Sequence, residues 1–301
     1  MPELHGLPYF EVQFTKDGAI FKDDEAEALR RFVADEAPSD LIVLSHGWNN
    51  DLEDARDLYD RLLRSVRLQL DAGDVVLGDR SFAVLAVLWP SKKFTDEDLV
   101  AGGAAGLGGV STSDLRREIE RLGTPSDIGG DVVDPIVRER LDEAEALVAR
   151  LDGSPSARRE FVDALRALLP TGDEEIDAEI PPELLSLDGD ELLGRLGTPP
   201  PLAPPTGGAG GAAVFGTAGG DGIPDDPDGP AFLSDLFGGI KAGARLLLNL
   251  TTYYTMKDRS WRVGASGASQ LVSELAGGDG PRLHLVGHSF GARLVSTVAT
   301  V

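Results

Sequence analysis

The sequence predicts an α/β fold in which a mostly parallel β-sheet is flanked by helices. Two short runs, 41-LIVLS-45 and 82-FAVLAVLW-89, are rich in branched apolar residues, which is typical of buried strands of a parallel sheet, and 282-RLHLV-286 is a third apolar run of strand length. The first and last runs are each followed by a loop and a segment with helical apolar spacing, the repeating unit of α/β proteins. An apolar content of 42% in 301 residues is sufficient for a large core.

The elements before residue 90 are assigned from turn signals and apolar spacing. In chain order they are a hairpin of two short strands over 8–21 with its turn at 16-KDG-18, a helix over 23–36, the strand 41–45, a helix over 51–70 and the strand 82–89. Asn50 and Glu53 have the spacing of a capping box, so we expect them to begin the second helix.

A long segment separates residue 89 from the strand 282–286, far longer than a crossover between parallel strands needs. We expect an insertion here, part helical and part disordered. Helical spacing occurs over 137–151, after the N-cap pair Ser154-Pro155, over 232–250 and over 265–275, whereas 102–109 and 197–230 are rich in Gly and Pro. The predicted domains are a first core part at 1–95, a helical insertion at 96–196, a flexible linker at 197–230 and a second core part at 231–301.

Charge and cysteine content argue against several classes of function. Lys and Arg number 28 against 51 Asp and Glu, and the net charge of −23 disfavours nucleic acid and anionic membranes as partners. The absence of cysteine removes disulfides, thiolate metal sites and cysteine nucleophiles. The longest apolar run, 82–89, is too short to span a membrane, and the first residues do not resemble a secretory signal. A cytoplasmic location is expected.

No cofactor or metal ion is expected from the motifs of the chain. The Gly-rich segment 102–109 lacks the Lys and Ser/Thr of a phosphate-binding loop. The acidic clusters at 173–179 and 225–228 lack the regular spacing of a calcium loop, and a solvated surface is the simpler interpretation.

The segment 287-GHSFG-291 has the form G-x-S-x-G and lies between an apolar strand and a helix-compatible run. This is the context of a nucleophile elbow, a sharp strand-to-helix turn in which the serine has unfavourable backbone dihedrals. Gly287 and Gly291 would let backbone and helix approach without a Cβ clash. We expect Ser289 to present its Oγ above the sheet as a nucleophile. The alternative is a helix N-cap serine in a tight turn.

The segment 44-LSHGWNN-50 follows the first buried strand and is the second candidate motif. Acyl transfer needs two fixed N–H donors, one from the residue after the nucleophile and one from a loop after a neighbouring strand. The backbone N–H groups of Phe290 and Trp48 fit these two roles. His46 and Gly47 would turn the loop so that its amide faces the pocket. Alternatively, His46 is a satisfied loop histidine and Trp48 is a core residue.

Together the two motifs resemble the α/β-hydrolases. VLSHGWNN would be the oxyanion loop after strand 3, and LHLVGHSFGARLV would be strand 5, the elbow and the next helix. The segment 253-YYTMKDRSWRVG-264 is similar to a bacterial subgroup of these hydrolases whose substrates are not defined. The resemblance covers about 1–95 and 232–301. It implies a partial hydrolase sheet of strands 1–5, with strand 3 between strands 4 and 5, so that Trp48 and Ser289 meet at its carboxyl end.

The resemblance also implies an acid and a histidine after the nucleophile, and the sequence departs from that order. The residues after Ser289 include no Asp, Glu or His, so the triad is not complete on this chain in the expected way. The four histidines offer poor substitutes: His288 is expected to point away into the supporting structure, His284 to pack on its strand, His5 to lie in a mobile terminus, and His46 to reach the pocket with its backbone only.

These observations predict a serine hydrolase, an esterase, lipase or thioesterase, of which this chain holds the amino-terminal part. It would act on a small-molecule ester or thioester through a covalent acyl-enzyme, with a downstream histidine taking the serine proton. Peptidase and acyltransferase activities share the same site chemistry. The alternative is a catalytically silent protein that keeps the hydrolase scaffold for binding, because the acid and the histidine are missing. The side chains of Tyr253, Tyr254, Met256 and Trp261 either line a pocket or belong to the core.

Overall fold

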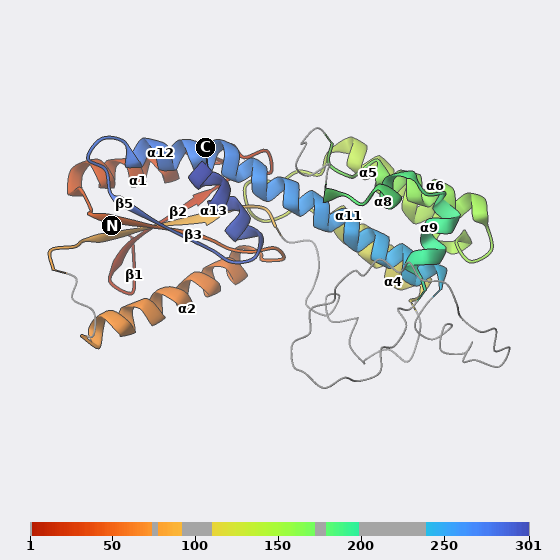
Figure 1. Cartoon of the computed structure of the whole chain (residues 1–301), viewed down its shortest axis with the longest axis horizontal. Helices are drawn as coiled ribbons and strands as arrows, with labels where there is room; N and C mark the ends of the chain where they lie inside the picture. Colours follow the sequence, from red (N-terminus) through yellow and green to blue (C-terminus); the bar gives the residue numbers. More distant parts are fainter. Residues whose placement is uncertain (1, 74–77, 92–109, 172–178, 199–238, 301) are drawn as a thin grey trace.

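One five-stranded sheet organises the amino-terminal and carboxy-terminal parts of the chain (Figure 1). The computed structural model describes residues 2–73, 78–91, 110–171, 179–198 and 239–300. The strands lie in the order β1 (Glu3–Leu4), β2 (Leu7–Gln13), β4 (Phe82–Leu88), β3 (Asp40–Ser45) and β5 (Arg282–Gly287). Only β1 is antiparallel to its neighbour, and the other pairs are parallel. The prediction of an α/β fold with a mostly parallel sheet is confirmed.

Helices cover both faces of this sheet, as the apolar strands require. Alternate residues of β3 point to opposite faces, so that Leu41 and Val43 pack in one apolar cluster and Leu44 packs in another. On the first face lie α1 (Asp23–Glu36), α12 (Ser269–Ala276) and α13 (Phe290–Thr300), and on the second lies α2 (Leu52–Asp71), as Figure 1 shows. The inner strands β3 and β4 are thereby held between two layers of helix, whereas β5 is partly exposed at the edge of the sheet.

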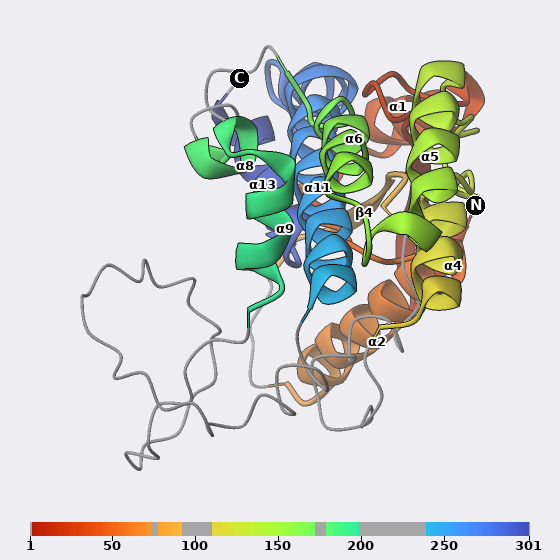
Figure 2. The same cartoon turned by 90° about the vertical axis from the view of Figure 1, so that its right-hand side faces the viewer.

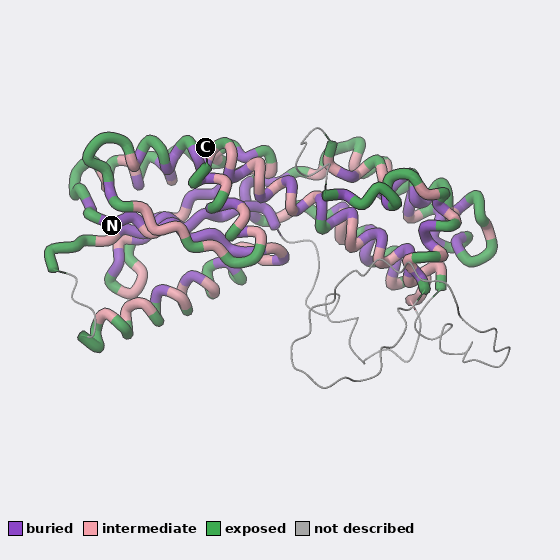
Figure 3. Tube along the Cα trace, in the orientation of Figure 1, coloured by how far each residue is buried: buried purple, intermediate pink, exposed green. Residues whose placement is uncertain are grey.

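A second apolar core lies in a helical unit formed between β4 and β5 (Figure 2). Its helices are α4 (Thr112–Leu122), α5 (Pro135–Leu147) with the single turn η1 (Val148–Arg150), α6 (Pro155–Arg166), α8 (Pro182–Ser186), α9 (Gly189–Leu196) and the first part of α11 (Ile240–Val263). Buried residues form separate stretches in the sheet and in this unit (Figure 3). The helix α11 joins them, because Leu247 packs in the helical core and Val263 packs beside the sheet.

The helix α11 continues without a break into α12 through a π-helical turn, η2 (Gly264–Ala268). Close packing accompanies this turn. A Cβ on Gly264 would lie 2.6 Å from the carbonyl oxygen of Leu294 on α13, and the Gly267 N–H donates to the carbonyl oxygen of Gly18 at 3.0 Å. The extra residue of a π turn is accommodated where the helix passes α13 and the loop after β2.

Several predicted elements are confirmed with small shifts in their bounds. The helix 23–36 coincides with α1, and Ser154 caps α6 with Pro155 as its first residue. The helix expected over 232–250 instead runs as α11 to Val263, because its apolar face continues past Leu250 into the sheet core. The Gly-rich segment 102–109, the acidic cluster 225–228, all but residues 197 and 198 of the predicted linker 197–230, and all but residue 179 of the acidic cluster 173–179 lie outside the described residues. In the described parts of the chain, no helix is both long and apolar enough to cross a membrane.

The hairpin predicted over 8–21 is confirmed only in part. Phe14 and Ile20 form an antiparallel bridge across the turn at 16–18, and the Phe21 N–H donates to the carbonyl oxygen of Gln13 at 2.8 Å, but within the described residues 14–21 no second strand forms. A separate hairpin joins β1 and β2 around the turn at His5, which has a φ of 51°. His5 is not in a mobile terminus, because its Nε2 is 2.8 Å from Oδ1 of Asp60 on α2. Two residues of β1 are enough to pair the terminus onto the sheet.

The capping box of α2 is displaced by one residue from the predicted pair. Asp51 is the N-cap, and its carboxylate accepts the backbone N–H of Asp54 at 2.9 Å while the Asp54 carboxylate accepts the N–H of Asp51 at 3.1 Å. Asn50 belongs instead to the preceding loop, where Ser91 donates to its carbonyl oxygen at 2.9 Å. An aspartate at the third helical position performs the part that was assigned to Glu53.

Candidate active site

Ser289 occupies a strained turn between β5 and α13. Its φ is 52°, in the left-handed region that residues with a Cβ rarely adopt, and its side chain is exposed. A Cβ on Gly287 would lie 2.4 Å from Cα of Ala292, and a Cβ on Gly291 would lie 2.3 Å from the carbonyl oxygen of His46. Both glycines are therefore required by close backbone contacts. The strained, exposed serine has the geometry expected of a nucleophile elbow.

The loop after β3 packs directly against this turn. β3 and β5 are parallel neighbours with Ser45 opposite Gly287, and the His288 N–H donates to the carbonyl oxygen of Ser45 at 3.1 Å. A Cβ on Gly47 would lie 2.7 Å from Nδ1 of His288 and 3.0 Å from Cβ of Ser289. Gly47 thus allows the two segments to touch, and both lie at the carboxyl end of the sheet, where ligands bind in open α/β sheets.

The two residues whose N–H groups were predicted to hold an oxyanion lie in the segments on either side of Ser289. Phe290 is the first residue of α13, so its N–H lies ahead of the first intrahelical hydrogen bonds, which Gly291 and Ala292 make to the carbonyl oxygens of His288 and Ser289. On the other side, Trp48 follows Gly47, and the next residue, Asn49, has a φ of 63° and donates its N–H to the carbonyl oxygen of Ser91 at 3.1 Å. The loop therefore has a fixed backbone course beside Ser289.

An aromatic cluster stands next to the turn. The ring centroid of Trp48 is 6.0 Å from that of Phe290 and 6.2 Å from that of Tyr253, and Tyr253 and Phe290 are 5.2 Å apart. Tyr253 belongs to α11 and is 37% exposed, whereas Tyr254 and Met256 are buried. The alternatives left open by the sequence divide between these residues. Tyr253 lies beside the candidate site, Tyr254 belongs to the helical core, and Met256 lines a cavity away from Ser289.

His46 holds the loop in place through its ring and its backbone. Its Nε2 accepts the backbone N–H of Trp89 at 3.1 Å, so Nδ1 carries the proton and donates to the carbonyl oxygen of Gly47 at 3.0 Å. The His46 carbonyl oxygen accepts the indole N–H of Trp89, and the His46 N–H donates to the hydroxyl of Tyr59. Burial lowers the pKa of His46 to about 4. A neutral ring with both nitrogens engaged is a satisfied loop histidine and does not serve as a base.

The remaining histidines are not hydrogen-bonded to Ser289 either. His5 is held by Asp60, and His284 is held by Asp40, whose Oδ1 lies 2.7 Å from its Nε2. Asp40 begins β3, and its carboxylate pairs with His284 on β5. The five residue steps from Asp40 to Ser45, which lies opposite Gly287, correspond to about 16 Å, so this pair is far from the turn at Ser289. His288 is exposed, with its ring against Gly47, so the expectation that it points into the supporting structure is wrong.

Supporting residues after β4 were missed in the sequence. Trp89 and Tyr59 are buried partners of His46, and the Ser91 hydroxyl donates to the carbonyl oxygen of Asn50 at 2.9 Å and accepts its N–H at 3.2 Å. A signal for Trp89 and Ser91 was present, because they follow a buried strand adjacent to β3, and the loops after adjacent parallel strands meet at the same edge. Their hydrogen-bond partners depend on tertiary contacts that no local spacing reveals.

Similarity to known proteins gives no indication of function, so a functional proposal depends on the geometry of this site. Comparisons with protein-family models, curated proteins and solved structures find no match to this chain. What the structure shows is an α/β fold with a five-stranded, mostly parallel sheet flanked by helices. At its carboxyl edge, a strained serine, two glycines in close backbone contact and a buried loop histidine are brought together.

Proposed function

We propose that this chain carries the acyl-transfer centre of a serine hydrolase of the α/β-hydrolase type, acting on a small-molecule ester or thioester. The observation that carries the proposal is the left-handed conformation of Ser289 on an exposed turn in contact with Gly47. Strain of this kind costs about 1–3 kcal/mol and persists where the surrounding structure enforces it. The position of β3 between β4 and β5 also supports the proposal, because it brings the two motifs to one edge.

In the proposed reaction the Oγ of Ser289 attacks the acyl carbonyl, and the carbonyl oxygen becomes an oxyanion. The N–H groups of Phe290 and Trp48 donate to that oxygen. Collapse of the tetrahedral intermediate expels the alcohol or thiol, and water then releases the acid from the acyl-enzyme. The side chains of Trp48, Tyr253 and Phe290 form an apolar wall that suits the acyl group. A general base must take the serine proton, and the described histidines do not place one in hydrogen-bond contact with Ser289.

This missing contact favours a second candidate, a catalytically silent scaffold that uses the same surface for binding. Here Ser289 would keep its conformation because of packing at the glycines, without an activated hydroxyl. The acid–histidine pair formed by Asp40 and His284 does not remove this alternative, since it lies at the opposite end of the strands. The two candidates differ in the reactivity of one hydroxyl.

A fluorophosphonate probe separates the two candidates. An active centre is expected to label stoichiometrically at Ser289, and the Ser289→Ala variant is expected to remain unlabelled. Ser296→Ala is the matched control, because Ser296 is an exposed serine on α13, the helix that follows Ser289, and its removal is expected to leave labelling unchanged. Absence of labelling in the unmodified protein supports the silent scaffold, and equal labelling of the protein and Ser289→Ala excludes Ser289 as the reactive group.

A further inference from the structure

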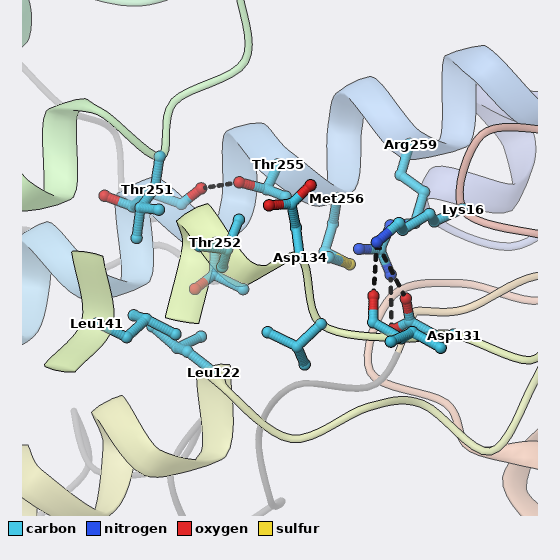
Figure 4. Close-up of a pocket in the computed structure, with 14 residues that line it drawn as sticks. Lys16, Leu122, Asp131, Asp134, Leu141, Thr251, Thr252, Thr255, Met256 and Arg259 are labelled. Atoms are coloured by element: carbon cyan, nitrogen blue, oxygen red, sulfur yellow. Dashed lines mark hydrogen bonds and ion pairs between the residues drawn. The ribbon is translucent and has the colours of Figure 1, made fainter. Parts of the chain in front are cut away.

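A cavity of about 270 Å³ lies between α11 and the segment that joins α4 to α5 (Figure 4). Half of its lining is apolar, from residues including Leu122, Val137, Leu141, Leu168 and Met256. If a water molecule takes about 30 Å³, the cavity holds on the order of ten non-hydrogen atoms. Neither Ser289 nor the aromatic residues beside it belong to the lining. The cavity is therefore distinct from the site described above.

Two cations converge at one end of this cavity. Figure 4 shows Lys16 and Arg259 directed at Asp131, with Leu122 and Leu141 toward the other end. Nη1 of Arg259 is 3.8 Å from Oδ2 of Asp131, and Nζ of Lys16 is 3.9 Å from its Oδ1. These separations are ion pairs without direct hydrogen bonds. The lining thus holds two cations and two carboxylates, Asp131 and Asp134, and Asp17 and Asp258 also interact electrostatically with Arg259.

The Arg259 guanidinium has donors that the described residues do not use. Its Nη1 donates to the carbonyl oxygen of Pro90 at 2.8 Å, and within the described chain its Nε and Nη2 make no hydrogen bond. The side chain is only 11% exposed, and burial lowers the pKa of Arg259. These two donors are not among the buried atoms without a partner, so they remain accessible to a ligand. The fork of guanidinium N–H groups matches both oxygens of a carboxylate.

The other polar groups of the lining are already engaged. The carboxylate of Asp134 accepts the backbone N–H of Ile136 at the start of α5. The hydroxyls of Thr251, Thr252 and Thr255 donate to carbonyl oxygens of their own helix, at 2.8–2.9 Å. The donors that remain for a ligand are consequently those of Arg259 and Lys16. This lining therefore suits a ligand that has a hydrogen-bond acceptor at the end near Arg259 and an apolar body that lies along α11.

We propose that the cavity binds an amphipathic monocarboxylate of on the order of ten non-hydrogen atoms, with its carboxylate on the Nε and Nη2 groups of Arg259. The alkyl chain lies against Leu122, Leu141 and Met256. This inference goes beyond the proposed function and holds for either candidate function, because none of its residues belongs to the elbow.

The test uses octanoate and 1-octanol as probes, with binding to the full chain measured by isothermal titration calorimetry. The two probes share the alkyl chain and differ in the charged head group. Octanoate is expected to bind at least about tenfold more tightly than 1-octanol, because only the carboxylate pairs with the guanidinium. The Ser289→Ala variant is expected to bind octanoate as the unmodified protein does, which separates this proposal from the fate of the elbow.

Two surface variants form a matched pair that leaves the buried arginine in place. Val132 lines the cavity beside Lys16 and is 70% exposed, and Ile136 is 64% exposed and does not line it. Val132→Glu adds a carboxylate near Lys16 and Arg259, and it is expected to weaken the binding of octanoate about tenfold without changing the binding of 1-octanol. Ile136→Glu adds the same charge and is expected to change the binding of neither probe.

Arg259→Gln then tests the central contact, with circular dichroism as the check of folding. It is expected to reduce octanoate affinity to that of 1-octanol. If this variant does not fold, the Val132→Glu and Ile136→Glu pair decides. The proposal is overturned if octanoate fails to bind, if octanoate and 1-octanol bind equally to the unmodified protein, if both Glu variants have the same effect on octanoate, or if a folded Arg259→Gln variant still prefers octanoate.

Discussion

The two ends of the β3–β5 strand pair differ in how the chain is held there. At the amino end, the buried carboxylate of Asp40 accepts hydrogen bonds from Arg80 and Ser39 and pairs with His284. At the carboxyl end, the chain enters a turn with Ser289 in a strained, exposed conformation. One end uses paired charge to stabilise the fold, and the other stores strain. The strained serine is the reason that the proposed chemistry is assigned to the carboxyl end, even though the acid–histidine pair lies at the amino end.

The largest effect is expected from filling the contact between the carboxyl-end segments. A Cβ on Gly291 would meet the carbonyl oxygens of His46 and Ser45 at 2.3 and 2.4 Å, and these are backbone atoms that cannot move aside. Gly291→Ala is expected to lower the free energy of unfolding by more than about 3 kcal/mol and to abolish probe labelling. Chemical denaturation measures the change. The control is Gly194→Ala on α9, where no atom lies within 4 Å of an added Cβ and a gain of up to about 1 kcal/mol is expected.

Acid is expected to weaken the carboxyl end through His46. The pKa of His46 is lowered to about 4 in the folded chain, against about 6.5 when unfolded, so the unfolded chain binds the extra proton between these values. Stability is therefore complete above about pH 6.5, and it falls as the pH drops toward 4, by on the order of 3 kcal/mol. Urea denaturation at several pH values measures this loss. His46→Gln is expected to flatten the curve in that window, and an unchanged slope in this variant would contradict the assignment.

The sequence was sufficient to predict the elements whose signal is local. Branched apolar runs located β3, β4 and β5, and the Ser154-Pro155 pair located the start of α6, because strand burial and helix capping depend on neighbouring residues. The path of α11 was not predictable in the same way. Its second half is shaped by contacts with η2, α13 and the sheet, which lie far apart in the sequence.

The candidate site divides along the same line. Gly287, Gly291 and the turn at Ser289 were predictable from the G-x-S-x-G pattern, since a steric requirement selects glycine at fixed positions. The role of His46 was not, because its ring is satisfied by Trp89, a residue after another strand. The cavity at Arg259 was also missed, because its lining combines α11 with loops from three distant parts of the chain.

At the amino end, removal of charge is expected to cost stability and leave reactivity intact. The Arg80 hydrogen bond holds the pKa of Asp40 well below its usual range, so this contribution is present above the unfolded pKa near 4 and is lost as the pH falls below it. Asp40→Asn is expected to lower the free energy of unfolding by about 1–2 kcal/mol, since Arg80 is partly exposed to solvent. Thermal denaturation measures it. Asp71→Asn, which removes an exposed pair with Arg67, is the control, with little change expected. A loss of probe labelling in Asp40→Asn would show that the two ends are coupled.

The smallest effect, and the sharpest test of stored strain, is expected at Ser289 itself. Glycine adopts a φ of 52° without steric cost, whereas alanine meets the same penalty as serine. Ser289→Gly is therefore expected to be about 1 kcal/mol more stable than Ser289→Ala, and both are expected to lose probe labelling. Calorimetric melting of the two variants measures the difference. If the two variants melt at the same temperature, the turn at residue 289 is not strained in solution. The contrast between a stabilised amino end and a strained carboxyl end then fails, because the surrounding packing would not be holding residue 289 in an unfavourable conformation.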